Sequence, residues 1–173
     1  CTAAAALFAT AALAQPPGGV KVSPQARAAH DAAIVLDTHF DTPSLFSRPG
    51  WVITARHDVD KDGSQVDLPR MIDGGADGGF FTIFTSQGPR TKAGNDAARA
   101  FGLNRAFEIR EMILKNPNTF ELALTADDAV RIAAAKKRIV FMSMENAYPL
   151  GDDPGMLQSF YGLGVRMVGF AHF

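Results

Sequence analysis

Four side chains that can bind metals or transfer protons follow hydrophobic runs of this sequence: His39, Asp41, Glu145 and His172. His39 and Asp41 stand two residues apart after the run 34–36. On an extended segment their side chains leave the same face, so both can bind one ion. A neutral imidazole and a carboxylate suit Zn²⁺ or another divalent first-row metal. His-x-Asp alone is a weak signal, because most pairs of this kind are ordinary exposed residues.

Glu145 and His172 each have a simpler interpretation when taken alone. Glu145 could be an acidic residue in the first turn of a helix, where the helix dipole stabilises it. His172 could be a hydrogen-bonded histidine at the rim of a sheet. However, each of the two ends a hydrophobic run, as His39 and Asp41 do. Active sites of parallel α/β barrels are built at the C-terminal ends of the strands, so we predict that all four side chains converge.

The elements that would position these residues alternate along the chain. The composition of the hydrophobic runs predicts four strands, at 34–36, 80–85, 139–144 and 165–170, and a short extended segment at 120–124. Helical spacing and capping residues predict helices at 24–33, 66–72, 95–115, 125–137 and 154–161. This alternation favours a parallel α/β sheet over a sandwich, a helical bundle or a repeat array.

Three other motifs are weaker candidates for function. Residues 58–63 match the first half of a calcium loop, but Pro69 stands where a bidentate glutamate is required, so we expect a solvated acidic turn. The glycine-rich segment 74–79 lacks the Lys-Ser/Thr of a phosphate loop and is expected to be a turn into the second strand. His30 and His57 are expected to be surface residues without a catalytic role.

Composition excludes some classes of partner. The chain has 173 residues, of which 47% are hydrophobic and 20% charged, and its formal net charge is -1. These values are typical of a globular protein with a sizeable core. Because no overall positive charge would attract a polyanion, nucleic acid is not an expected partner.

The first residues have the composition of an export signal. Residues 1–14 are apolar, rich in alanine and uncharged, and they end in Ala-Leu-Ala before a Pro/Gly-rich stretch. We interpret 1–14 as a signal peptide whose basic start is missing, 15–23 as a linker and 24–173 as the folded domain, so the protein is expected to be secreted or periplasmic. An alanine-rich helix of the mature protein is the alternative. Cys1 is the only cysteine, which excludes disulfides and cysteine ligands; lipid attachment there is disfavoured but left open.

Several segments together resemble the renal (membrane) dipeptidase family, a group of zinc dipeptidases. The segment 35–43 is similar to the opening metal motif of that family, and 74–85 to its glycine-rich second strand. The segment 143–147 stands where the family has a glutamate at a strand end, and 161–166 leads into Ala-His as it does there. The resemblance extends from about residue 33 to residue 173.

This resemblance implies a fold, a reaction and roles for the four residues. The family is a (β/α)8 TIM barrel of the metal-dependent hydrolase type that binds two Zn²⁺ ions. His39 and Asp41 would bind one ion, Glu145 would bridge both, and His172 would contact the substrate and steady the tetrahedral intermediate. The implied function is zinc-dependent hydrolysis of dipeptides through a metal-activated water.

The resemblance is incomplete in two respects. Phe40, Thr42 and the pair 146–147 depart from the family pattern around the site, so pocket shape and substrate preference are open. The chain also covers only about the first four strands of the barrel. We expect the other histidine ligands and a proton-transferring aspartate beyond residue 173, and no activity from the 173 residues alone. A homodimer of the full-length protein is left open.

Two alternatives to a dipeptidase remain at this stage. Another metal-dependent amidohydrolase on the same barrel would typically begin with His-x-His. The presence of Asp41 in place of the second histidine counts against this alternative. An inactive periplasmic binding relative would need no metal.

Overall fold

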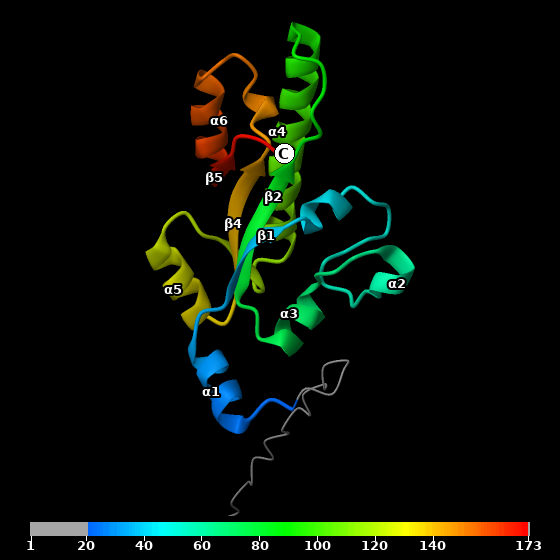
Figure 1. Ribbon diagram of the computed structural model, residues 1–173. Helices are drawn as coiled ribbons and strands as arrows, with labels where there is room; N and C mark the ends of the chain where they lie inside the picture. Colours follow the sequence, from blue (N-terminus) through cyan, green and yellow to red (C-terminus); the bar gives the residue numbers. More distant parts are fainter. Residues whose placement is uncertain (1–20, 173) are drawn as a thin grey trace, which may run out of the picture.

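The protein is a parallel α/β structure, described here by a computed structural model for residues 21–172 (Figure 1). The sheet consists of β1 (Leu36–Phe40), β2 (Gly78–Phe84), β3 (Phe120–Leu122), β4 (Arg138–Glu145) and β5 (Val165–Gly169). All its strand pairs are parallel, which confirms the predicted fold class. The predicted signal peptide 1–14 and linker residues 15–20 lie outside the described residues.

β4 lies at the centre of the sheet, and two strands, β3 and β5, pair with the same edge of it. The strand order is β1-β2-β4-β3, and β5 also pairs with β4. β3 occupies the start of that edge, with Leu122 opposite Val140, and β5 occupies its end, with Gly169 opposite Glu145. The four predicted strands are therefore present as β1, β2, β4 and β5. The extended segment predicted at 120–124 contributes one further short strand.

The helices follow the predicted pattern, with three short additions. They are α1 (Pro24–Ala32), α2 (Val59–Asp62), α3 (Leu68–Gly74), α4 (Lys92–Lys115), α5 (Ala126–Ala134) and α6 (Gly155–Leu163), with the 3-10 turns η1 (Thr42–Leu45) and η2 (Tyr148–Leu150). The predicted caps are present: Ser23 caps α1, and Thr125 with Asp128 forms a capping box on α5. The additions are α2 and the two 3-10 turns, which lie in segments for which no helix was predicted. None of these helices, within residues 21–172, is long and apolar enough to cross a membrane.

The two faces of the sheet carry different side chains. One face, which we call the packed face, consists of Phe81, Ile83, Val140, Met142 and Met144. These residues form the main hydrophobic core with the buried side of α4 and with Phe160 of α6. The alternate residues of β2 and β4 form the other face, which we call the site face: Phe80, Thr82, Phe84, Ile139, Phe141, Ser143 and Glu145.

α5 covers the lower part of the site face. Its residues Ala129 and Ile132 pack with Ile139 and Phe141 in a second, smaller core. The handedness of the connections explains this position. The chain crosses the sheet from β2 to β3 through α4 and returns from β3 to β4 through α5, and right-handed crossovers in opposite directions use opposite faces. In Figure 1, α5 lies at the lower end of the sheet and the carboxyl ends of the strands point upward.

The glycine-rich segment 74–79 is a turn into β2, as predicted. Gly75 ends α3 in the left-handed conformation, with φ of 75°. Gly79 permits the close approach of β1, because a Cβ atom there would lie 2.4 Å from the carbonyl oxygen of Asp37. A side chain at this position would force β1 away from β2 and displace the residues that β1 carries.

His57 and the acidic segment 58–63 form a local hydrogen-bonded structure. The His57 ring stacks on Trp51, and its Nδ1 and Nε2 atoms lie 2.7 Å from Asp62 and 2.9 Å from the carbonyl oxygen of Val52. With its side chain only 12% exposed, His57 is not the surface residue that was expected. Hydrogen bonds from Ser64, together with His57, lower the pKa of Asp62 to about 2. This carboxylate is therefore hydrogen-bonded within its own segment, which forms the short helix α2 rather than the solvated turn that was expected.

Candidate metal centre

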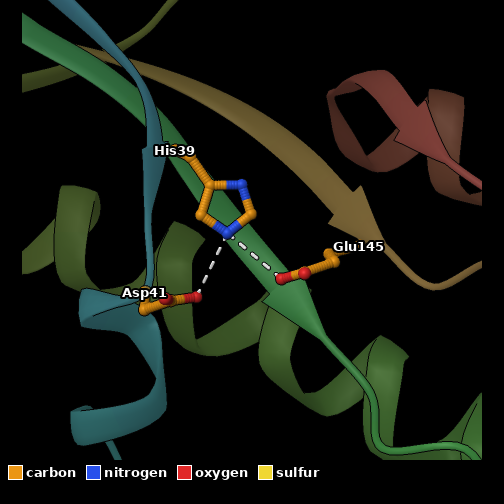
Figure 2. Close-up of side chains that lie close together, drawn as sticks. All are labelled: His39, Asp41 and Glu145. Atoms are coloured by element: carbon orange, nitrogen blue, oxygen red, sulfur yellow. Dashed lines mark ion pairs between the residues drawn. The ribbon is translucent and has the colours of Figure 1, made fainter. Parts of the chain in front are cut away.

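The four predicted residues lie together at the carboxyl end of the sheet. His39 belongs to β1, Asp41 follows β1 directly, Glu145 is the last residue of β4, and His172 follows β5. The His39 Nε2 atom is 3.3 Å from Asp41 Oδ1 and 3.1 Å from Glu145 Oε2 (Figure 2). The His172 Nε2 atom is 3.5 Å from the other Glu145 oxygen, Oε1. The predicted convergence is therefore confirmed, with His39 inside the strand rather than after it.

The donor atoms of His39, Asp41 and Glu145 have the chemistry and spacing of a metal site. All three lie within 4.8 Å of one another, and no other group of this kind occurs among residues 21–172. Ligand atoms bound at about 2.0 Å to one tetrahedral Zn²⁺ are separated by roughly 3.3 Å. The two separations from His39 are close to that value. One imidazole nitrogen facing two carboxylate oxygens is thus an arrangement that a divalent cation would stabilise.

A β-bulge turns His39 toward the site. The pairing of β1 with β2 shifts between Asp37, which is opposite Gly79, and Phe40, which is opposite Phe81. Three residues of β1 therefore span two of β2, which reverses the alternation of its side chains. As a result Phe40 joins the packed face and His39 joins the site face. The Asp37 carboxylate stabilises the bulge by accepting a 2.9 Å hydrogen bond from the His39 backbone N–H.

Asp41 is held by the turn that follows it. η1 begins at Thr42, and the guanidinium of Arg105, from α4, donates a hydrogen bond to the Pro43 carbonyl oxygen. Arg105 is 8% exposed and pairs with Glu108 at 2.6 Å. Burial lowers the pKa of Arg105, an effect that Glu108 opposes. Arg105 was not predicted from the sequence, although a charged residue on the apolar stripe of a helix is a signal of a buried role.

His172 lies on the far side of Glu145 from His39 and contacts an aromatic ring. The centroid of the Phe84 ring is 5.0 Å from that of His172. Phe84 is opposite Glu145 in the strand register, so the last residues of β2 and β4 together flank this histidine. Phe84 was also missed from the sequence, although its place two residues after Thr82 puts it on the site face.

The candidate ligands line an open pocket of about 430 Å³. His39, Asp41 and Glu145 are on its wall together with His172. The remaining lining residues are Ser44, Thr82, Phe84, Phe101 and Arg105. Polar groups that converge at one point of a partly apolar pocket are typical of a small-molecule site.

Comparison with known proteins identifies the family of this chain. The family described as membrane dipeptidase, peptidase family M19, matches residues 23–173. The dipeptidase tcpJ of Claviceps purpurea is 28% identical over 111 residues, which are 62% of this chain and 26% of the relative.

Two solved structures are similar in fold and sequence. The probable dipeptidase PvdM from Pseudomonas aeruginosa has a TM-score of 0.71 and 32% identity, over 86% of this chain and 37% of that one. A metallopeptidase from Rhodobacter sphaeroides, solved with a phosphinate mimic of the dipeptide L-Ala-D-Ala, has a TM-score of 0.66 and 27% identity, over 80% of this chain and 45% of that one. The chain thus spans less than half the length of each of these relatives. From the family match over residues 23–173, the chain belongs to the membrane dipeptidase family, peptidase family M19.

Proposed function

We propose that the complete gene product containing this chain is a zinc-dependent dipeptidase. The observation that carries the proposal is the meeting of His39, Asp41 and Glu145 within 4.8 Å, in a chain of a metallopeptidase family. The named relatives support the substrate class, since two are called dipeptidases and a third binds a dipeptide mimic.

His39, Asp41 and Glu145 are the residues that would hold the metal. His39 and Asp41 would bind one ion, and the two oxygens of Glu145 would allow it to bridge to a second. Glu145 is suited to bridging because Oε2 faces His39 while Oε1 faces His172. Among residues 21–172 these three side chains are the only group of three such ligands, and we propose that further ligands of a second ion come from the rest of the complete gene product. Zinc is the proposed metal because imidazole nitrogen and carboxylate oxygen are both common zinc ligands.

The chain's own residues would orient the substrate at this site. When bound, the metal would activate a water and polarise the scissile carbonyl group. His172 would donate a hydrogen bond to the oxygen of that carbonyl, where negative charge develops. The Phe84 ring restricts the orientation of His172, and Arg105 keeps the turn after Asp41 in place. The site is open enough to admit a dipeptide, and we propose that a D-residue is tolerated at the C-terminal position, as in the mimic bound by the Rhodobacter enzyme.

Metal analysis and hydrolysis of a dipeptide panel by the complete gene product test the proposal. We expect bound zinc, hydrolysis that a chelator abolishes and Zn²⁺ restores, and loss of activity in Glu145→Gln. The 173-residue chain alone is expected to be inactive. Metal-free protein with full activity, or hydrolysis indifferent to chelation, would contradict the proposal. Protein that binds no metal and hydrolyses no dipeptide would contradict it too, and would favour the inactive binding relative.

We also propose that residues 1–14 direct export and are removed after Ala14. Sequencing the N-terminus of the mature protein from the extracytoplasmic fraction tests this, and the expected first residue is Gln15. An intact N-terminus on protein recovered from the cytoplasm would contradict it.

A further inference from the structure

The residue after Glu145 has an unusual backbone conformation. Asn146 has a φ of 65°, and the only other non-glycine residue with positive φ among residues 21–172 is Lys136. Asparagine adopts this left-handed region more readily than most residues. At this position it ends β4 abruptly, so that the chain leaves the sheet directly after Glu145. Unusual backbone conformations of this kind gather at functional sites, where surrounding contacts fix them.

The Asn146 side chain continues the ladder between β2 and β4 after the backbone has turned away. The last regular pair is Phe84 opposite Glu145. Beyond it, the Asn146 Nδ2 group donates a 2.8 Å hydrogen bond to the Thr85 carbonyl oxygen, while the Thr85 N–H donates to the Glu145 carbonyl oxygen at 3.4 Å. Both backbone groups of Thr85 are thereby tied to residues 145–146. Asn146 is 4% exposed, so water does not compete readily for these bonds.

Further hydrogen bonds hold the same turn from other sides. The Asn146 Oδ1 atom accepts a 3.3 Å hydrogen bond from the Tyr148 N–H, and Nδ2 lies 3.3 Å from Gln87 Oε1. The Ala147 N–H donates at 3.3 Å to the carbonyl oxygen of Phe170, two residues before His172. The turn therefore connects the ends of β2, β4 and β5, the strands that carry Phe84 and Glu145 and lead to His172.

We propose that Asn146 is a positioning residue that fixes the Glu145 carboxylate between His39 and His172. It acts through the backbone of Glu145 and through the strand ends, and it binds no ion itself. The inference rests on the proposed function, because the carboxylate that Asn146 orients is the proposed bridging ligand. The proposal gives the side-chain amide of Asn146 a role of its own. The left-handed turn does not require this amide, because glycine could also make the turn.

Asn146→Gly separates the two tasks, because glycine retains the left-handed turn and removes the amide. Lys136→Gly is the matched control: it makes the same replacement at a left-handed residue before the start of β4, at its other end. In the complete gene product, the affinity for Zn²⁺ is measured by competition with a chromophoric chelator. We expect Asn146→Gly to weaken Zn²⁺ binding at least tenfold and Lys136→Gly to change it less than twofold. Native affinity in Asn146→Gly would overturn the proposal.

Amide hydrogen exchange of the metal-free protein distinguishes this proposal from the proposed function. The Thr85 and Ala147 amides are expected to exchange faster in Asn146→Gly and at the native rate in Lys136→Gly. If the native protein binds no Zn²⁺, the proposed function fails, and exchange then decides the role of Asn146. Unchanged protection of both amides would overturn the positioning role, whereas faster exchange of both in Asn146→Gly alone would support it.

Discussion

The packed face and the site face of the sheet are made from alternate residues of the same two strands, β2 and β4, yet they have different roles. On the packed face, Phe81, Ile83 and Met142 are fully buried beneath α4 and α6. On the site face, the side chains change along β4 from Ile139 at its start to Glu145 at its end. The comparison shows that one strand can secure the fold through one set of residues and present chemistry through the other.

The site face is graded from apolar to polar. Ile139 and Phe141 pack against α5, and the Phe141 ring stacks on Phe80 at 4.8 Å. The next layer is a hydrogen bond of 3.1 Å between the hydroxyls of Thr82 and Ser143. Glu145 follows at the open end. α5 thus closes the lower end of this face and leaves the upper end free to form a site.

The largest expected effect comes from truncating the packed face. Phe81→Ala removes a fully buried ring that meets Phe40 edge to face at 5.4 Å. We expect the free energy of unfolding to fall by about 3–5 kcal/mol, the usual cost of a buried Phe→Ala change, measured by denaturant unfolding. Phe84→Ala, three residues along β2 on the site face, is the matched control. It should cost less stability and affect Zn²⁺ binding or catalysis more; equal losses of stability would break the distinction between the faces.

The hydroxyls of Thr82 and Ser143, which form the polar middle layer of the site face, should be strongly coupled in their effects on the free energy of unfolding. Thr82→Val leaves the Ser143 hydroxyl without this buried partner, and we expect a loss of about 1–3 kcal/mol in the free energy of unfolding. In the double variant Thr82→Val/Ser143→Ala both hydroxyls are absent, so most of that loss should be recovered. Strictly additive losses in a double-mutant cycle would show that the two hydroxyls act independently.

The cap of α5 tests how far this helix stabilises the site face. Thr125→Ala removes the N-cap hydroxyl of the capping box and should lower the free energy of unfolding by about 1 kcal/mol. Ser23→Ala removes the corresponding cap of α1, a helix without buried residues, and should cost less. Thermal unfolding of both variants checks this order. A larger loss from Ser23→Ala would mean that α5 is the less important of the two helices.

The smallest expected effect is the pH dependence of the same capping box. Hydrogen bonds from Arg131, the Leu124 backbone and Thr125 lower the pKa of Asp128 from 3.8 to about 2. A carboxyl whose pKa is lower in the folded state contributes stability above its unfolded pKa and loses it as the pH falls through the folded pKa. Asp128→Asn should therefore be less stable than the native chain above about pH 4, and the difference in Tm should vanish toward about pH 2. A difference that persists unchanged to pH 2 would contradict the stated cause.

The sequence was informative where a local pattern sufficed. The hydrophobic runs of β2 and β4, the long helix α4 and the Thr125/Asp128 cap follow from composition and spacing alone. The convergence of His39, Asp41, Glu145 and His172 also followed, because each lies at the end of a strand in a parallel sheet.

Features that depend on tertiary contacts were not evident in the sequence. The extended conformation of β3 was predicted, but its pairing with the start of β4 was not. The place of α5 on the site face follows from the strand order rather than from its own sequence. The bulge that turns His39, the anchoring of η1 by Arg105 and the left-handed turn at Asn146 arise from contacts between segments distant in the chain.

The most direct test of the central claim is a crystal structure of the complete gene product grown with Zn²⁺, with anomalous diffraction recorded at the zinc edge. We predict an anomalous peak at roughly 2.0–2.2 Å from the His39 Nε2 atom and from carboxylate oxygens of Asp41 and Glu145. A zinc-loaded protein whose peaks all lie away from these three residues would contradict the account.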